Sequence, residues 1–426
     1  MSPNAQKDDV FLAWKLLFQP WKWKISINQL TPLDKLSNGA SQHKSAIKKL
    51  EEEFKNYLGI KYACSFNSGR STLMAILSAL GTGEGDEVLI QAFTCNAVPN
   101  SIIWSKVRPI YVDIDETLNI DPEDLEKRIT PKSKAIIVQH TFGAPAQMDK
   151  ILTLAECYNL KIIEDCAHSL GAEYQGKKVG TFGVASFFSF GRDKIISSVY
   201  GGMVATNNPD LAEKIKEFQE KCPYPSKFWI FQQLLHPIVF SIALPFYYFL
   251  NFGKFLIWFC QNLRLLSKAV TKKEKNGENP GYFPQKMLNA LACLALNQLK
   301  KIEKFNEHRR KIAELYERNM RTDDFSVVPR NARCGSAIYW KYSIFTENPN
   351  EVRKKLKKNK IILDDGWWGS PIMPRDTNLE KLGYKMGSCP KAEKIAKTIL
   401  NLPTHINISV ENAKKIINLF QKSELP

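Results

Sequence analysis

The strongest constraint on the fold is an alternation in the first half of the chain. Short apolar runs, five or six residues long, alternate there with segments of helical periodicity. The runs occupy residues 87–91, 108–113, 135–140, 161–165, 185–190 and 202–206. Buried strands of this length separated by helices are typical of a sheet with helices packed against it. The pattern therefore predicts an α/β fold.

The chain is long enough to form two α/β domains. It has 426 residues, of which 44% are hydrophobic, so it can form a large domain and a smaller one. A charged helical stretch over 296–320 is expected to lead to a small carboxyl-terminal α/β domain that begins near Phe325. The predicted division is an amino-terminal arm with an aromatic and basic segment, a large cofactor-binding domain, an apolar and basic segment, and a linking helix with the small domain. These parts cover 1–40, 41–222, 223–280 and 281–426.

The cysteines and histidines indicate the compartment. Nine cysteines are scattered without a CxxC pair, six histidines are dispersed, and no secretory signal opens the chain. We therefore expect a reducing, cytoplasmic compartment and no metal site.

One series of side chains points to a specific chemistry. Asp165 ends the apolar run 160–165, Ser189 follows in the segment FFSFGRDK, and Lys194 ends that segment. Pyridoxal 5'-phosphate requires an amine for a Schiff base, a carboxylate against its ring nitrogen and donors around its phosphate. Lys194, Asp165 and Ser189 could supply one each, and His168 could reach the ring hydroxyl.

A second segment offers a phosphate site. The turn NSGRS at 67–71 lies between the apolar run 62–66 and a helical run, so its backbone N–H groups could face a phosphate. Arg70 could add a bidentate contact. Taken singly, each residue has a simpler interpretation as a helix cap, a surface charge or a structural histidine.

Six blocks in order carry a resemblance to a known family. They read FNSGRSTLMAILSALGTGEGDEVLIQAFT, PIYVDID, HTFGAPAQMDKI, IIEDCAHSLGAEYQGKKVGTFGVASFFSFGRDK, GGMVAT and CPKAEKIAKTILNLPTH. From about Ser41 to the end, with one interruption, the chain resembles the pyridoxal phosphate-dependent sugar aminotransferases of the DegT/DnrJ/EryC1/StrS family. The resemblance implies pyridoxal phosphate fold type I, the aspartate aminotransferase-like fold, with a large mixed-sheet domain and a small α/β domain.

The resemblance also implies roles for single residues. Lys194 falls on the Schiff-base lysine, Asp165 on the partner of the pyridine nitrogen, and both are expected to be catalytic. The cofactor-binding residues expected are Gly69, Arg70, Ser71, Cys95, Asp165, His168, Ser189 and Lys194. Family members that act as dehydratases have histidine in place of the lysine, so Lys194 favours transamination. The implied partners are glutamate as amino donor, a nucleotide-linked keto sugar destined for a cell-surface polysaccharide or glycan, and a second subunit in a homodimer.

Three departures from the family pattern suggest an altered pocket. Cys95 stands where an aromatic residue usually stacks on the cofactor ring, and Tyr200 stands where glutamate is frequent. The block 280–286 lacks the family's asparagine that reaches the neighbouring subunit's cofactor. These departures leave open a catalytically impaired member that serves as a membrane-anchored interaction protein. The other alternative, a pyridoxal phosphate enzyme that acts on a lipid-linked sugar, is suggested by the apolar segment described next.

The interruption is an apolar helical insert. Residues 228–253 contain no Asp, Glu, Lys or Arg, and as one straight helix they would span about 39 Å. Pro237 and Pro245 interrupt this segment, and basic residues follow it. Three interpretations stay open: an element at a membrane surface or re-entrant from its inner face, a true span, or packing within the protein or a dimer.

The amino terminus and the net charge complete the sequence observations. Residues 11–24 interleave Trp14, Phe18, Trp21 and Trp23 with lysines, a composition that favours the water–lipid boundary. The net charge is +17, but no nucleic-acid-binding motif accompanies it, so we expect no nucleic-acid partner.

Overall fold

The structure is a computed structural model that describes residues 4–18, 45–320, 326–327, 335–363 and 366–421. The predicted contribution of Trp21 and Trp23 lies outside these residues. The main helices of the first part are α1 (Lys7–Leu17), α2 (Ala46–Leu58), α3 (Gly69–Ala79), α4 (Ala97–Trp104), α5 (Pro122–Arg128), α6 (Met148–Cys157) and α7 (Pro209–Lys221). They are followed by α8 (Lys227–Ala243), α9 (Phe252–Asn262), α10 (Lys272–Lys275), α11 (Asn289–Leu299), α12 (Ile302–Asn319), α13 (Pro349–Lys358), α14 (Pro390–Thr398) and α15 (Val410–Gln421).

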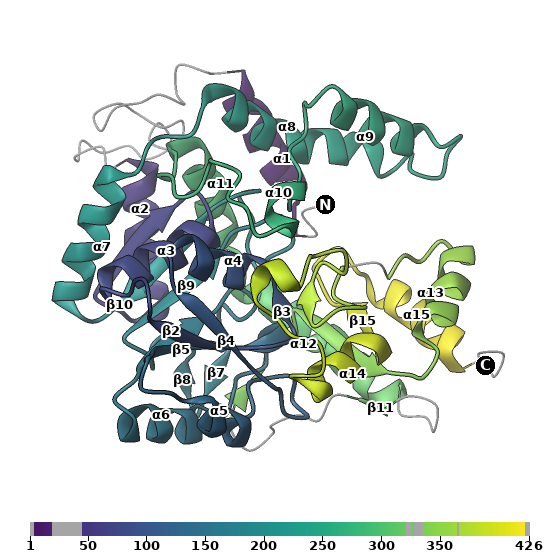
Figure 1. Cartoon of the computed structure of the whole chain (residues 1–426). Helices are drawn as coiled ribbons and strands as arrows, with labels where there is room; N and C mark the ends of the chain where they lie inside the picture. Colours follow the sequence, from purple (N-terminus) through teal and green to yellow (C-terminus); the bar gives the residue numbers. More distant parts are fainter. Residues whose placement is uncertain (1–3, 19–44, 321–325, 328–334, 364–365, 422–426) are drawn as a thin grey trace.

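A mixed sheet of seven strands organises the first part of the chain (Figure 1). Its order is β1-β10-β9-β6-β5-β2-β4, formed by Tyr62–Phe66, Gly202–Thr206, Ala185–Ser189, Lys161–Asp165, Ser133–Gln139, Glu87–Gln91 and Arg108–Val112. Strand β10 pairs antiparallel with both β1 and β9, whereas the remaining neighbours pair parallel. The predicted α/β fold with a mixed sheet is confirmed.

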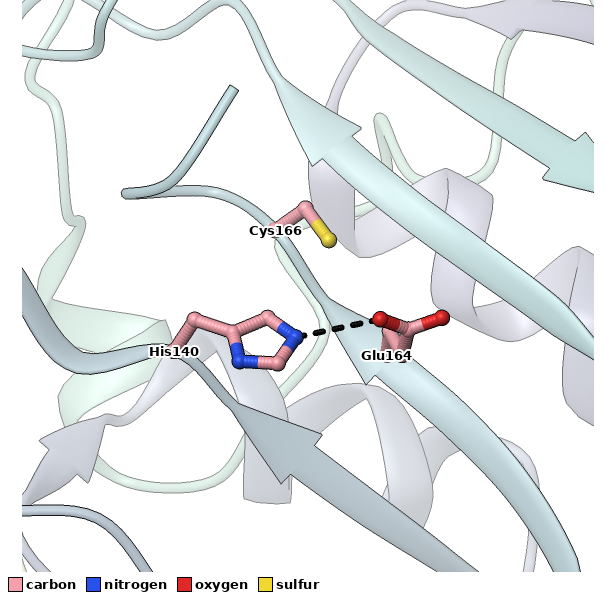
Figure 2. Close-up of side chains that lie close together, drawn as sticks. All are labelled: His140, Glu164 and Cys166. Carbon is pink, nitrogen blue, oxygen red and sulfur yellow. Dashed lines mark hydrogen bonds and ion pairs between the residues drawn. The ribbon is translucent and has the colours of Figure 1, made fainter. Parts of the chain in front are cut away.

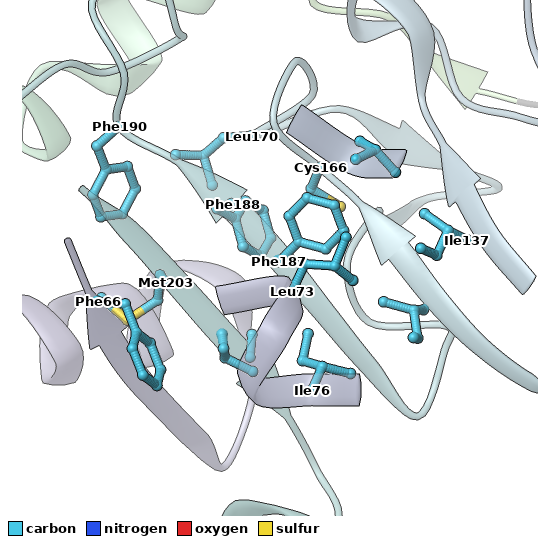
Figure 3. Close-up of a cluster of buried hydrophobic side chains, with 14 of the residues drawn as sticks. Phe66, Leu73, Ile76, Ile137, Cys166, Leu170, Phe187, Phe188, Phe190 and Met203 are labelled. Carbon is cyan, nitrogen blue, oxygen red and sulfur yellow. The ribbon is translucent and has the colours of Figure 1, made fainter. Parts of the chain in front are cut away.

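The sheet's strands form because their side chains are buried on both faces. Every residue of β2 is buried, as are all of β10 and most of β5. Near-continuous apolar runs are what such strands require. Figure 3 shows part of the core, in which Leu73 of α3 lies beside Phe187 of β9. Phe188 and Met203 face the other side of the sheet, where Phe188 packs against Phe54 of α2.

A smaller sheet lies in the last third of the chain. Strands β11 (Ser326–Val327), β13 (Lys341–Phe345) and β15 (Ile399–Pro403) pair antiparallel in that order. Side chains of α12, α13 and α15 form a second hydrophobic core beneath it, which includes Tyr316, Val352 and Ile416. The predicted helical stretch 296–320 is two helices, α11 and α12, because the chain turns at Lys300 and Lys301. The domain limits named above stay a prediction.

Three short pairings complete the sheets. Strands β3 (Thr94–Cys95) and β14 (Ile372–Met373) pair parallel. Strand β7 (Glu173–Tyr174) pairs with both β8 (Lys177–Lys178) and β12 (Gly335–Ser336). The first pairing ties the end of the large sheet to the carboxyl-terminal part of the chain.

The apolar segment 228–253 is not one straight helix. Helix α8 ends at Ala243, the chain turns over 244–251, and α9 returns along it, so the two helices form a hairpin. Pro245 would interrupt the helical hydrogen bonds at this point. No helix within the described part of the chain combines the length and the apolar character that crossing a bilayer requires. The interpretation of this segment as a true span is therefore unsupported.

Candidate active site

The predicted side chains meet in one cavity at the carboxyl ends of the parallel strands. Asp165 ends β6, Ser189 ends β9, and Lys194 lies in the loop after β9. The cavity has a volume of about 450 Å³, and its wall includes all three of these residues together with His168 and Arg70. Ligand sites of open α/β sheets occupy this position because several strand ends and loops converge there.

Lys194 and His168 are in direct contact. The Lys194 Nζ lies 3.0 Å from the His168 Nε2. Burial lowers the pKa of His168 well below its usual value, and the charge of Lys194 lowers it further. The imidazole is therefore neutral, so its Nε2 accepts a hydrogen bond from the lysine and its Nδ1 carries the proton. This buried Nδ1 has no hydrogen-bond partner among the described residues.

Asp165 is held almost entirely out of water. Its residue is 4% exposed, and its Oδ1 accepts a hydrogen bond of 3.0 Å from the backbone N–H of Ala167. Burial raises the pKa of Asp165 to about 6, although the Ala167 N–H and the charge of Lys194 act in the opposite direction. A carboxylate in this state would be stabilised by a cation placed beside it.

The turn before α3 presents a helix amino terminus to the cavity. Ser68 caps the helix, since its Oγ accepts a hydrogen bond from the Ser71 N–H. The amides at the start of α3 have no partner within the helix and can bind an anion. Gly202 allows this close arrangement, because a Cβ there would lie 2.6 Å from the Ser68 carbonyl carbon. Ser71 itself is buried, and it donates its hydroxyl to Asn67 and its backbone N–H to Ser68.

The Arg70 guanidinium forms a buried ion pair. Its Nε lies 2.7 Å from the Oε1 of Glu274, and the two side chains are 11% and 0% exposed. The other Glu274 oxygen accepts from the backbone and hydroxyl of Thr271. Arg70 therefore ties the start of α3 to α10 in addition to lining the cavity.

Cys95 forms part of the cavity wall through β3. It pairs with Met373 of β14 and is half-buried. Burial raises the pKa of the Cys95 thiol above its usual value, against the opposing charges of Arg70 and Lys194. The thiol is consequently neutral and offers a soft apolar contact to whatever occupies the cavity.

Tyr200 and the block 280–286 have structural contacts of their own. The Tyr200 hydroxyl donates to the Lys268 carbonyl at 2.8 Å, and its ring packs against Trp229 of α8. The block 280–286 lies beside the end of β1, and its Gln285 carbonyl accepts a hydrogen bond of 3.0 Å from the Asn67 N–H. The residues at both departures from the family pattern therefore join segments that are far apart in the sequence.

Several cavity residues were not identified from the sequence. The Trp340 ring stacks on His168 with ring centroids 4.0 Å apart, and Trp367 lines the cavity. His236 and Phe240 of α8 and Gln261 of α9 also line it. These residues reach the cavity only through tertiary packing, so no local sequence motif reveals them. Arg192 was within reach of sequence reasoning, since it lies inside the segment FFSFGRDK.

A buried cluster of His140, Glu164 and Cys166 lies beside the site (Figure 2). Their ligand atoms lie within 4.8 Å of one another, as a metal site would require. However, the His140 Nδ1 accepts from the Ala146 N–H, so its Nε2 donates to Glu164 at 3.1 Å. Glu164 also accepts three backbone N–H groups of the loop 180–183. These hydrogen bonds occupy the lone pairs that a metal would need and fix the loop below the cavity.

Comparison with known proteins identifies relatives along nearly the whole chain. GDP-perosamine synthase of Caulobacter vibrioides is 30% identical over 378 residues, which cover 87% of this chain and 88% of that protein. The spore coat polysaccharide biosynthesis protein SpsC of Bacillus subtilis is 27% identical over 426 residues and 97% of each chain. The structure titled as a sugar aminotransferase of Streptococcus pneumoniae, Spr1654, in its PLP form superimposes with a TM-score of 0.72. That likeness has 21% identity and covers 98% of this chain and 96% of the other.

The profile of one family matches residues 28–229 and 256–421, leaving 230–255 unmatched. This match spans well over half of the sequence and bears out the family resemblance drawn from the six blocks. The chain belongs to the DegT/DnrJ/EryC1/StrS aminotransferase family.

Proposed function

We propose that this protein is a pyridoxal phosphate-dependent aminotransferase that transfers an amino group from glutamate to a nucleotide-linked keto sugar. The observation that carries the proposal is the convergence of Lys194, Asp165 and the start of α3 on one cavity. A relative named as GDP-perosamine synthase and another named for spore coat polysaccharide biosynthesis support a nucleotide sugar used for a surface polysaccharide.

The residues of the cavity fit the cofactor. A buried carboxylate with a raised pKa suits a protonated ring nitrogen, and the first turn of α3 suits a phosphate. Asp165 would hold the ring nitrogen, whereas Ser189 and the amides of Gly69 and Arg70 would hold the phosphate, with Ser71 beside them in the first turn of α3. Cys95 would contact the ring face and His168 the ring hydroxyl. When bound, pyridoxal 5'-phosphate supplies an aldehyde that exchanges amines and a ring that withdraws electrons.

Lys194 is the group that can anchor the cofactor and move protons. Its Nζ is 3.0 Å from a neutral imidazole, and its side chain is only 13% exposed. As a free amine, the Lys194 Nζ can accept a proton from one carbon atom and donate it to another. His168 orients this amine through its Nε2, and Trp340 holds the imidazole by stacking.

We also propose a homodimer that works at the cytoplasmic face of a membrane without crossing it. The dimer is supported by the family resemblance. The location is supported by residues 230–255, which fall outside the family match and expose several large apolar side chains.

A transfer assay tests the proposed reaction. Purified protein is incubated with nitrogen-15-labelled glutamate and a panel of keto sugars carrying different nucleotides, and the products are analysed by mass spectrometry. We expect the label in one amino sugar together with an equal amount of 2-oxoglutarate. Formation of 2-oxoglutarate with no amino sugar across the panel would contradict the substrate class, and neither product would contradict the reaction.

A further inference from the structure

The hairpin of α8 and α9 exposes an unusual number of large apolar side chains. We call Phe246, Phe249, Leu250, Phe252, Phe255 and Trp258 the aromatic face. Leu250 is 86% and Phe249 is 65% exposed, and the other four are close to half exposed. Together they present roughly 700 Å² of surface, which is more than the largest apolar patch of most monomeric proteins. Such a face is expected to be covered by a partner.

The charged residues of the segment that contains this face are all basic. From Lys227 to Lys273 the chain contains six lysine or arginine residues and no Asp or Glu. Lys254, Arg264 and Lys268 are exposed on or just after α9. The Lys254 Nζ lies 5.4 Å from the ring centres of both Tyr247 and Tyr248. Aromatic side chains interleaved with lysine and arginine favour the boundary between water and anionic lipid.

The position of the hairpin suits contact with a flat partner. Figure 1 shows α9 at the upper edge of the molecule, with α1 beside α8. Helix α1 exposes Phe11, Trp14 and Phe18 along one side, and Lys15 lies among them. None of these helices is long and apolar enough to cross a bilayer. Elements of this kind lie within the headgroup region.

We propose that the aromatic face docks into the interfacial region of a bilayer that contains anionic lipids, with basic side chains of the hairpin against the headgroups. A second copy of the chain is a poorer occupant. In a twofold contact the same surface meets itself, and the exposed basic residues of both copies would then face one another. An anionic lipid surface instead neutralises them.

Docking at this face would bring the bilayer close to the active site. The hairpin also supplies Phe240 and Gln261 to the wall of the cavity that holds Lys194. An amino sugar formed there would be released beside the membrane, where enzymes that transfer sugars to lipid carriers could use it. This inference rests on the proposed location and is independent of the proposed reaction.

Vesicle sedimentation tests the inference with the full-length protein. One set of vesicles contains phosphatidylcholine with roughly 30 mol% phosphatidylglycerol, and the other contains phosphatidylcholine alone. The test variant is Phe249→Ser/Leu250→Ser, which leaves the cavity untouched. The matched control is Tyr158→Ser/Met386→Ser, which removes two exposed large side chains after α6 and before α14. Light scattering gives the oligomeric state of each protein in solution.

We expect the wild type and the control to bind anionic vesicles, and the test variant to bind at least about tenfold more weakly. Binding to neutral vesicles should be weaker, and high salt should reduce the difference. Absence of vesicle binding by the wild type, or equal loss in both variants, would overturn the proposal. So would a test variant with a lower oligomeric state, which would assign the face to contacts between copies. No outcome requires bound cofactor, so a failure here is distinct from a failure of the transfer assay.

Discussion

At the level of single residues, the chemistry depends on how burial sets charge. Burial holds the pKa of His168 well below its usual value, so a neutral imidazole lies next to Lys194. Asp165 is the opposite case, because burial raises its pKa to about 6 and makes its charge costly until a cation is beside it. Without a cation beside Asp165, the cavity therefore carries a penalty that the proposed cofactor would remove.

This penalty predicts how pH affects the cofactor-free protein. The pKa of Asp165 in the folded state, about 6, lies above its usual value of 3.8, so folding is penalised when the group is ionised. The penalty is small below about pH 4 and complete above about pH 6. Asp165→Asn should thus raise the free energy of unfolding by about 1–3 kcal/mol at pH 8. Most of this gain should be lost near pH 4.

Urea denaturation of cofactor-free protein at several pH values measures the effect of this substitution. Glu116→Gln, at an exposed position, is the control and should show no such trend. A gain that stays constant from pH 4 to pH 8 would show that the carboxylate is not the source of the penalty.

The buried pair of Arg70 and Glu274 allows a second residue-level prediction. Removing one partner leaves the other charge buried without compensation, so Arg70→Met or Glu274→Met should each cost about 3 kcal/mol or more. The double variant should be closer to the wild type than the sum of the two singles, because neither charge then remains.

A double-mutant cycle from equilibrium unfolding determines the coupling between Arg70 and Glu274. Arg108→Met serves as a control, since Arg108 is 73% exposed and its contact with Glu87 should contribute less than about 1 kcal/mol. Additive effects of the two single substitutions would show that the pair does not act as a unit.

At the level of elements, the hairpin depends on one close approach between its helices. A Cβ on Gly253 of α9 would lie 1.9 Å from the Ala243 carbonyl oxygen of α8, so the two backbones meet there. A small core of Val239, Cys260 and Leu266 holds the helices together beyond this point. The glycine thus determines how closely α9 folds back on α8.

Gly253→Ala should therefore loosen the hairpin. The added methyl group must displace backbone, and we expect a loss of about 1–3 kcal/mol together with faster proteolysis within 244–262. Gly83→Ala is the matched control, because no atom lies within 4 Å of a Cβ built there. Limited proteolysis and thermal unfolding of both variants provide the comparison, and equal behaviour would contradict the close packing of the two helices.

The elements that could be predicted from the sequence are those with local signals. The runs 87–91, 161–165 and 202–206 are strands with the expected limits, because buried strands need apolar side chains on both faces. The hairpin was harder, since composition alone does not decide whether an apolar segment continues or folds back. Contacts such as Trp340 on His168 and Glu274 with Arg70 join segments far apart in the sequence. No spacing within either segment could reveal them.

At the level of the whole molecule, the part of the chain that matches the family contains most of the candidate active site, and the hairpin adds a surface of its own. The mixed sheet brings Asp165, Ser189 and Lys194 to one edge, and the family match extends on both sides of the hairpin. The hairpin is outside that match, yet it contributes to the cavity wall and exposes the aromatic face. The proposed chemistry and the proposed location thus belong to different parts of one chain that meet at the cavity.

The central claim is that Lys194 anchors the cofactor and moves the proton, and one absorbance measurement tests it most directly. Wild-type protein loaded with pyridoxal 5'-phosphate should show a visible absorption band that glutamate removes, with one 2-oxoglutarate formed per site. Lys194→Ala should still bind the cofactor but react with glutamate at least about a thousandfold more slowly. A Lys194→Ala protein that reacts with glutamate at a rate near that of the wild type would contradict the account.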